Sequence, residues 1–181
     1  IYATNVLGVA KPRVGIVSIG EEEGKGNIEV KEAYELIKAT PNLNFVGNLE
    51  GKDIPAGQAD VVVTDGFTGN VIIKLSEGIA SLIVQELRES LLSSLRTKLG
   101  ALLAKPAFRS LGSKLDYAEY GGAVLLGLNH ICIIGHGRSN ERAVRSAIRV
   151  AGEAVRTDVV GKIRAGLTEQ PVSAAGVDTA A

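Results

Sequence analysis

The chain has 181 residues, of which 45% are hydrophobic, 22% are charged and 4% are aromatic, a size that suits one globular domain or a large part of one. Its 20 basic and 20 acidic side chains cancel, which argues against a globally basic nucleic-acid-binding protein. One cysteine and two histidines exclude an intrachain disulfide framework and a usual structural zinc site, and we expect no metal or other cofactor.

The ends of the chain point to a cytoplasmic fragment of a longer protein. The sequence starts at Ile1, contains no methionine, and opens on what reads as the end of one element and a linker. No apolar run reaches the roughly 18 residues that span a bilayer, and no signal peptide opens the chain. We expect residues 1–165 to form the C-terminal portion of one domain, followed by a disordered tail over residues 166–181.

Apolar patterns predict alternating strands and helices along the chain. In chain order they predict a strand at 14–20, a helix at 26–40, strands at 44–48 and 59–65, a helix from Asn70, strands at 123–127 and 130–135, and a helix from Asn140. The first helix has Val30, Ala33, Tyr34 and Ile37 on one face. For the second helix the inward residues are predicted to be Ile72, Leu75, Ile79, Leu82 and Ile83, and for the third Val144, Ala147, Ile148, Ala151, Val155 and Val159.

This alternation predicts an α/β fold, with a mostly parallel sheet covered by helices on both faces in a Rossmann-like three-layer arrangement. Three glycine-rich corners join predicted strands to helices, at residues 20–27, 65–70 and 135–140. In a parallel sheet these corners would lie at the same edge, where ligands bind.

The three corners together favour an anion site, because glycine lets the backbone approach a ligand and helix N-termini offer unpaired N–H groups. Lys25, Asn70, His136, Arg138 and Ser139 add hydrogen-bond donors. None of the corners has the spacing of a Walker A or dinucleotide-binding loop. Each residue also has a structural interpretation: Asn70 or Ser139 as a helix cap, Lys25 as a solvated lysine, and any one corner as a turn.

A leucine-rich basic stretch follows the second predicted helix. Residues 86–115 hold six basic and two acidic side chains, and residues 85–114 are predicted to form a helical hairpin broken at Gly100 and Pro106. The hairpin could be a core or dimer element, or its tip could lie on an anionic membrane. The expected membrane or partner contacts are Leu99, Leu102, Leu103, Lys98 and Lys105.

Four segments carry specific motifs, which include DGFTGN, EYGGA and GHGRS: residues 5–27, 45–55, 59–74 and 116–148. In this order they resemble the PlsX family of acyl-[acyl-carrier-protein]–phosphate acyltransferases of bacterial phospholipid synthesis. The resemblance implies the C-terminal half, or slightly more, of a family member, because the family's opening Asp-x-Met-Gly-Gly-Asp-type loop has no counterpart. It also implies a fold similar to phosphate acetyltransferases and the isocitrate-dehydrogenase-like group.

The resemblance further implies acyl-carrier thioester and inorganic phosphate as substrates, a homodimer, no cofactor, and an apolar tip that contacts the inner membrane face peripherally. It implies Lys25, Asn70 and His136 as catalytic residues, with Asp65 orienting Lys25 or Asn70. The residues expected to bind phosphate or substrate are Gly24, Gly26, Asn27, Asp65, Gly66, Thr68, Gly69, Gly137 and Ser139. Alternatives are a related short-chain phosphate acyltransferase or dehydrogenase, or a non-catalytic fragment that binds a membrane or carrier.

Overall fold

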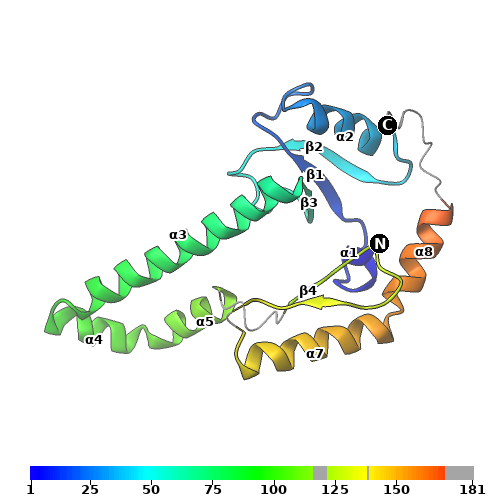
Figure 1. Ribbon diagram of the computed structural model, residues 1–181. Coiled ribbons are helices and arrows are strands. Elements are labelled where there is room, and N and C mark those ends of the chain that lie inside the picture. Colours follow the sequence, from blue (N-terminus) through cyan, green and yellow to red (C-terminus); the bar gives the residue numbers. More distant parts are fainter. Residues whose placement is uncertain (116–121, 138, 170–181) are drawn as a thin grey trace. The chain divides into compact units, whose positions relative to one another are not determined.

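The computed structural model describes residues 1–115, 122–137 and 139–169. The chain divides into two compact units, each described below by itself. The first contains Ile1–Thr64, Leu128–Ile131 and the chain from Glu153 on, and the second contains Asp65–Gly127 and Cys132–Gly152. The predicted α/β class is confirmed, with a parallel sheet and helices in a Rossmann-like arrangement (Figure 1).

The first unit is built on a three-stranded parallel sheet in the order β2-β1-β3. Its elements are α1 (Tyr2–Asn5), β1 (Arg13–Val17), α2 (Ile28–Ala39), β2 (Asn44–Leu49), β3 (Val61–Val63) and α8 (Val159–Glu169). Central strand β1 buries Val14, Gly15 and Ile16, which explains its continuous apolar run. Strand β3 lies within its predicted segment, and β1 and β2 overlap theirs but extend one residue beyond, at Arg13 and Leu49.

Helix α2 confirms the predicted helix and its inward face. Asn27 caps it, with Oδ1 accepting a hydrogen bond from the Val30 N–H at 2.8 Å. Val30, Ala33, Tyr34 and Ile37 are all half-buried, while most of the other helix residues are exposed. The Tyr34 ring packs edge-on against Phe45 of β2, with centroids 5.0 Å apart, so α2 packs against the sheet (Figure 1).

The second unit contains the long helix α3 (Gly66–Leu92), followed by α4 (Leu95–Leu103) and α5 (Lys105–Leu115). The predicted break at Gly100 is wrong, whereas a break next to Pro106 is confirmed, because α4 ends at Leu103 and α5 starts at Lys105. Helix α4 runs through Gly100, and Ser94 starts it with a capping box to Thr97. Pro106 lies in the first turn of α5, where its missing N–H costs no helical hydrogen bond.

The second unit also contains β4 (Ala123–Val124), β5 (Ile133–Ile134) and most of α7 (Glu141–Arg156). Strands β4 and β5 pair antiparallel, in a sheet separate from the parallel one. The third corner therefore does not follow a strand of the parallel sheet, and the prediction of one shared sheet edge fails for it.

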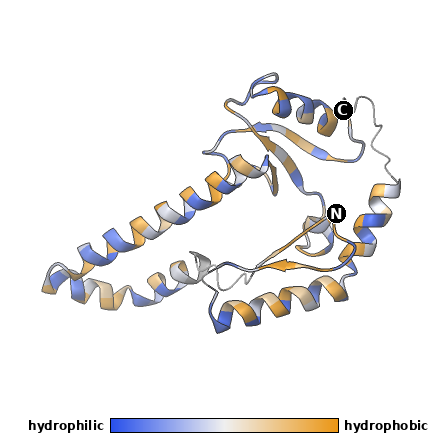
Figure 2. Cartoon of the chain, viewed as in Figure 1, coloured by the Kyte–Doolittle hydropathy of each residue, from blue (hydrophilic) through white to orange (hydrophobic). Residues whose placement is uncertain are grey.

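Two predicted helix faces are wrong in part. Leu75, Ile79, Leu82 and Ile83 of α3 are exposed in this chain rather than buried. On α7, Ala143 and Ala154 are buried, whereas Val144, Ile148 and Val155 are exposed. Val159 is 1% exposed and belongs to α8, because Asp158 turns the chain with a φ of 47°. Figure 2 shows apolar residues recurring along all of α3 and α7.

By length and composition α3 could cross a membrane, with a mean hydropathy of 1.4 over an 18-residue window. The sequence analysis predicted no membrane-spanning segment here, because Lys74 and Glu77 interrupt the apolar run. Core helices of soluble proteins meet the same criterion. Helix α8 continues through Glu169, four residues into the predicted tail, and residues 170–181 lie outside the described part of the chain.

Candidate functional site

The first corner, residues 20–27, is a tight turn between β1 and α2. Gly24 and Gly26 adopt φ values of 85° and 106°, which glycine reaches at little cost. A Cβ at Gly26 would come within 2.7 Å of the Val30 side chain and 3.1 Å of the Ser18 hydroxyl, so this turn has no room for a side chain there. The predicted catalytic Lys25 is exposed between these two glycines.

Two polar side chains beside this corner were not predicted. Asn48, at the end of β2, is 7% exposed and donates its Nδ2 hydrogen to the Glu22 carbonyl at 2.7 Å. Its Oδ1 and the Ser18 hydroxyl are buried without a hydrogen-bond partner among the described residues. Such groups are uncommon in folded proteins and often bind a water or a ligand. The sequence signal was present, since Asn48 ends a buried strand directly after Gly47.

The second corner, residues 65–70, is the start of α3 rather than a loop before it. Asp65 is the cap, with Oδ1 accepting from the Thr68 N–H at 2.8 Å. Hydrogen bonds from the Thr68 side chain and from this N–H lower the pKa of the Asp65 carboxyl. Gly66, Thr68 and Gly69 therefore lie in the first turns. Asn70 is inside the helix and exposed, so its interpretation as a cap is wrong.

The third corner, residues 135–140, places a half-buried imidazole before α7. The Ser139 N–H and hydroxyl both donate to the His136 carbonyl, at 2.9 and 2.6 Å, which fixes the turn that contains Gly137. Asn140 caps α7 through a 3.0 Å bond from the Ala143 N–H. Both donors of Ser139 are thus used within the turn. Residue 138 lies outside the described part of the chain.

Helix α3 and the third corner meet at Glu77. The Nε2 of His136 lies 3.9 Å from Glu77 Oε2, and the same oxygen is 3.4 Å from Lys74 Nζ. Asn70, Lys74 and Glu77 recur at helical spacing, so they share one side of α3. The second unit therefore gathers an amide, an ammonium group, a carboxylate and an imidazole, which are groups that can bind an anion and move a proton.

The predicted catalytic residues fall in different units. Asn70 and His136 belong to the second unit, and Glu77, which the sequence analysis missed, lies on the same helix as Asn70 and 3.9 Å from His136. Lys25 belongs to the first unit with Gly24, Gly26 and Asn27. The predicted membrane contacts are all exposed on α4 and at the start of α5, and Leu103 reaches 78% exposure.

Comparison with known proteins identifies the family. The family model described as "Fatty acid synthesis protein" matches residues 1–162. The chain belongs to this family. Phosphate acyltransferases resemble it over most of its length: that of Nitratidesulfovibrio vulgaris (strain DP4) is 56% identical over 150 residues, which are 83% of this chain and 44% of the relative.

Two other relatives cover more of this chain. The phosphate acyltransferase of Aquifex aeolicus is 55% identical over 162 residues, or 90% of this chain and 48% of the relative. That of Heliobacterium modesticaldum is 49% identical over 164 residues, which are 91% of this chain and 49% of the relative. The chain therefore spans about half the length of the curated relatives it matches.

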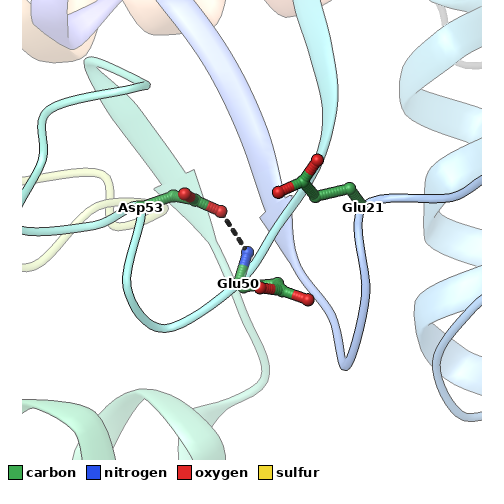
Figure 3. Close-up of side chains that lie close together, drawn as sticks. All are labelled: Glu21, Glu50 and Asp53. Atoms are coloured by element: carbon green, nitrogen blue, oxygen red, sulfur yellow. Dashed lines mark hydrogen bonds between the residues drawn. The ribbon is translucent and has the colours of Figure 1, made fainter.

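One acidic cluster in the first unit brings three carboxylates together. Glu21, Glu50 and Asp53 place carboxylate oxygens within 4.8 Å of one another, and Asp53 also accepts the Glu50 N–H (Figure 3). Lys52 already binds Glu50 at 2.6 Å and Glu21 at 3.2 Å, and both contacts raise the pKa of Lys52. A cation would compete with this ammonium group, so the cluster serves as a surface ion-pair network.

Proposed function

We propose that the protein containing this chain is a phosphate acyltransferase of bacterial phospholipid synthesis. It would convert an acyl-[acyl-carrier-protein] and inorganic phosphate to an acyl phosphate and free carrier protein. The observation that carries the proposal is 49–56% identity to phosphate acyltransferases over 83–91% of the chain. The exposed donors on two glycine-rich corners supply the anion-binding chemistry that this reaction needs.

In the proposed reaction a phosphate oxygen attacks the thioester carbonyl carbon. A C–O bond forms, the carbonyl oxygen becomes an oxyanion, and the C–S bond then breaks to release the carrier thiolate. The phosphate proton is finally transferred to that thiolate, so atoms and charges balance. This route needs no metal or nucleotide.

Each predicted catalytic residue has a distinct proposed role. Lys25 neutralises phosphate and orients it, assisted by the amides of Gly24, Gly26 and Asn27. Asn70 donates from its side-chain amide to the oxyanion, and Asp65 caps α3, the helix that carries Asn70. His136 transfers the proton to the leaving thiolate, and Glu77 keeps its imidazole in place.

We also propose a cytoplasmic homodimer that contacts the membrane peripherally. Leu75, Ile79 and Leu82 form an exposed apolar stripe along α3, of the kind that a second copy covers. Leu99, Leu102 and Leu103 are exposed on α4 beside Lys98 and Lys105, a combination that suits an anionic lipid surface.

The deciding experiment follows free carrier thiol from a long-chain acyl-carrier thioester, with and without inorganic phosphate. The full-length protein and the 181-residue chain are measured side by side. We expect phosphate-dependent thiol release by the full-length protein. Thiol release that is the same with and without phosphate, or no thiol release, would overturn the proposal. The remaining alternatives would then be a related-fold enzyme or a non-catalytic binding fragment.

A further inference from the structure

The helical hairpin of the second unit contains an apolar groove with no assigned role. It has a volume of about 880 Å³, within the range of small-molecule sites. Helix α3 forms one wall, and α4 with α5 forms the other. The apolar residues along the groove are Val84, Leu87 and Leu91 on the first wall and Ala101, Phe108 and Leu111 on the second.

The groove is separate from the stripe that we assign to a second copy. At 100° per residue, Val84, Leu87 and Leu91 share one side of α3, whereas Leu75, Ile79 and Leu82 lie on the opposite side. Both sets are apolar, and Figure 2 shows apolar residues along the whole of α3, interspersed with hydrophilic ones. A dimer formed through the outer stripe would leave the groove open to another occupant.

The charges on the groove favour an anionic amphiphile. Arg88 lines it from α3 and Lys105 from the start of α5, and no acidic residue is among the described residues that line it. Neither cation has an ion-pair or hydrogen-bond partner within the described part of the chain. An alkyl chain would be buried against the leucines, while a phosphate group would bind the guanidinium and ammonium groups.

We propose that this groove binds a long-chain acyl phosphate, with its alkyl chain along the apolar walls and its phosphate at Arg88 and Lys105. The inference rests on the proposed function, which supplies a ligand with this combination of chain and charge. The groove would hold the product with its chain away from water until a second acyl transfer consumes it. Product release, rather than chemistry, would then depend on chain length.

The test uses alkyl phosphates of increasing chain length as stable probes, kept below their micelle concentrations. Their binding to the full-length protein is measured calorimetrically, without carrier or turnover. Each buried methylene should tighten binding about fourfold until the groove is filled. Affinity that does not depend on chain length would overturn the proposal.

Two variants locate the probe. Gly112 lines the groove, and a Cβ there would meet nothing within 4 Å, so Gly112→Leu fills the space without a clash and suits the helix. This variant should bind dodecyl phosphate at least tenfold more weakly than the wild type does. The matched control is Gly78→Leu, at a helical glycine with equally open surroundings that does not line the groove, and it should bind as the wild type does.

Charge and self-association are tested separately. The double variant Arg88→Gln with Lys105→Gln should weaken the binding of dodecyl phosphate about tenfold. It should leave the binding of dodecanol, which has no charge, unchanged. If dodecyl phosphate instead dissociates the dimer, a second copy occupies the groove and the proposal is wrong. Groove binding without phosphate-dependent thiol release would remove the proposed reaction, and with it the acyl phosphate product, and leave only an alkyl phosphate site. Thiol release without groove binding would remove only the groove.

Discussion

A single carboxylate oxygen of Glu77 lies 3.9 Å from His136 Nε2 and 3.4 Å from Lys74 Nζ. The first distance is too long for a direct hydrogen bond, but it suits an ion pair when the imidazole is protonated. Glu77 stands two turns after Asn70 on α3, so the corner that carries His136 is tied to the helix that carries Asn70. Glu77 is therefore a positioning residue in the proposed reaction.

Replacing Glu77 with glutamine should lower turnover about tenfold, a part of the 100- to 10,000-fold that acid–base catalysis contributes. The KM for the acyl-carrier substrate should stay the same, because Glu77 acts through His136. Glu86→Gln, an exposed change on the same helix, is the control and should have no effect. Equal turnover in all three proteins would show that His136 does not depend on this carboxylate.

The proposed roles of Lys25 and Asn70 predict separable losses. Asn70→Ala removes an oxyanion donor and should lower kcat by about 100- to 1,000-fold. Lys25→Ala should raise the KM for phosphate as well, because it removes the charge that binds the anion. Lys31→Ala changes an exposed lysine on α2 and serves as the control. Phosphate-dependent thiol release at the wild-type rate in both variants would refute the site assignment.

The start of α3 shows why the second corner was only partly predictable. Two glycines among residues 66–69 disfavour a helix, so the sequence analysis began it at Asn70. The Asp65 cap outweighs that preference, because its carboxylate binds the Thr68 N–H. The antiparallel pair β4–β5 could have been predicted, since a short Gly-Leu-Asn turn can join only antiparallel strands.

Burial was less predictable than helix position. The spacing of Leu75, Ile79 and Leu82 correctly places them on one face of a helix, but spacing does not say whether this chain or a partner covers that face. The contact between Glu77 and His136 joins residues 59 positions apart, beyond the reach of local patterns. Glycines and caps predicted the corners, whereas the contacts that join elements needed the structure.

The hairpin tip should decide membrane association. Leu99→Asp with Leu102→Asp places two carboxylates on the exposed apolar surface of α4 and should abolish co-sedimentation with anionic liposomes. Leu7→Asp with Leu36→Asp makes the same charge change at similarly exposed leucines elsewhere, and should leave sedimentation intact. A wild-type protein that stays in the supernatant would remove the membrane contact altogether.

The two glycines around Lys25 should differ in their tolerance of alanine. Both require a positive φ, but only Gly26 also lacks space, because a Cβ there would lie 2.7 Å from a Val30 methyl carbon. Gly24→Ala should cost about 1 kcal/mol of unfolding free energy, and Gly26→Ala about 2–3 kcal/mol. Urea unfolding measures both, and equal costs would mean that the first corner relaxes freely.

The ion pair that joins β1 to the residue before β3 should make stability depend on pH. Arg13 binds Asp60 through Nη2 to Oδ1 at 2.9 Å and through Nε and its backbone N–H to Oδ2, and these bonds lower the Asp60 pKa from 3.8 to about 2. A lowered carboxyl pKa contributes stability that is complete above the ordinary pKa and is lost as the pH falls through the folded value.

Asp60→Asn should therefore lower the urea midpoint at neutral pH, and its difference from the wild type should shrink from about pH 4 to about pH 2. Arg13→Gln serves as the partner control, because without the guanidinium Asp60 loses the main cause of its lowered pKa. Its difference from the wild type should shrink over the same pH range. A difference for Asp60→Asn that stays constant down to about pH 2 would show that the carboxylate contributes through packing rather than charge.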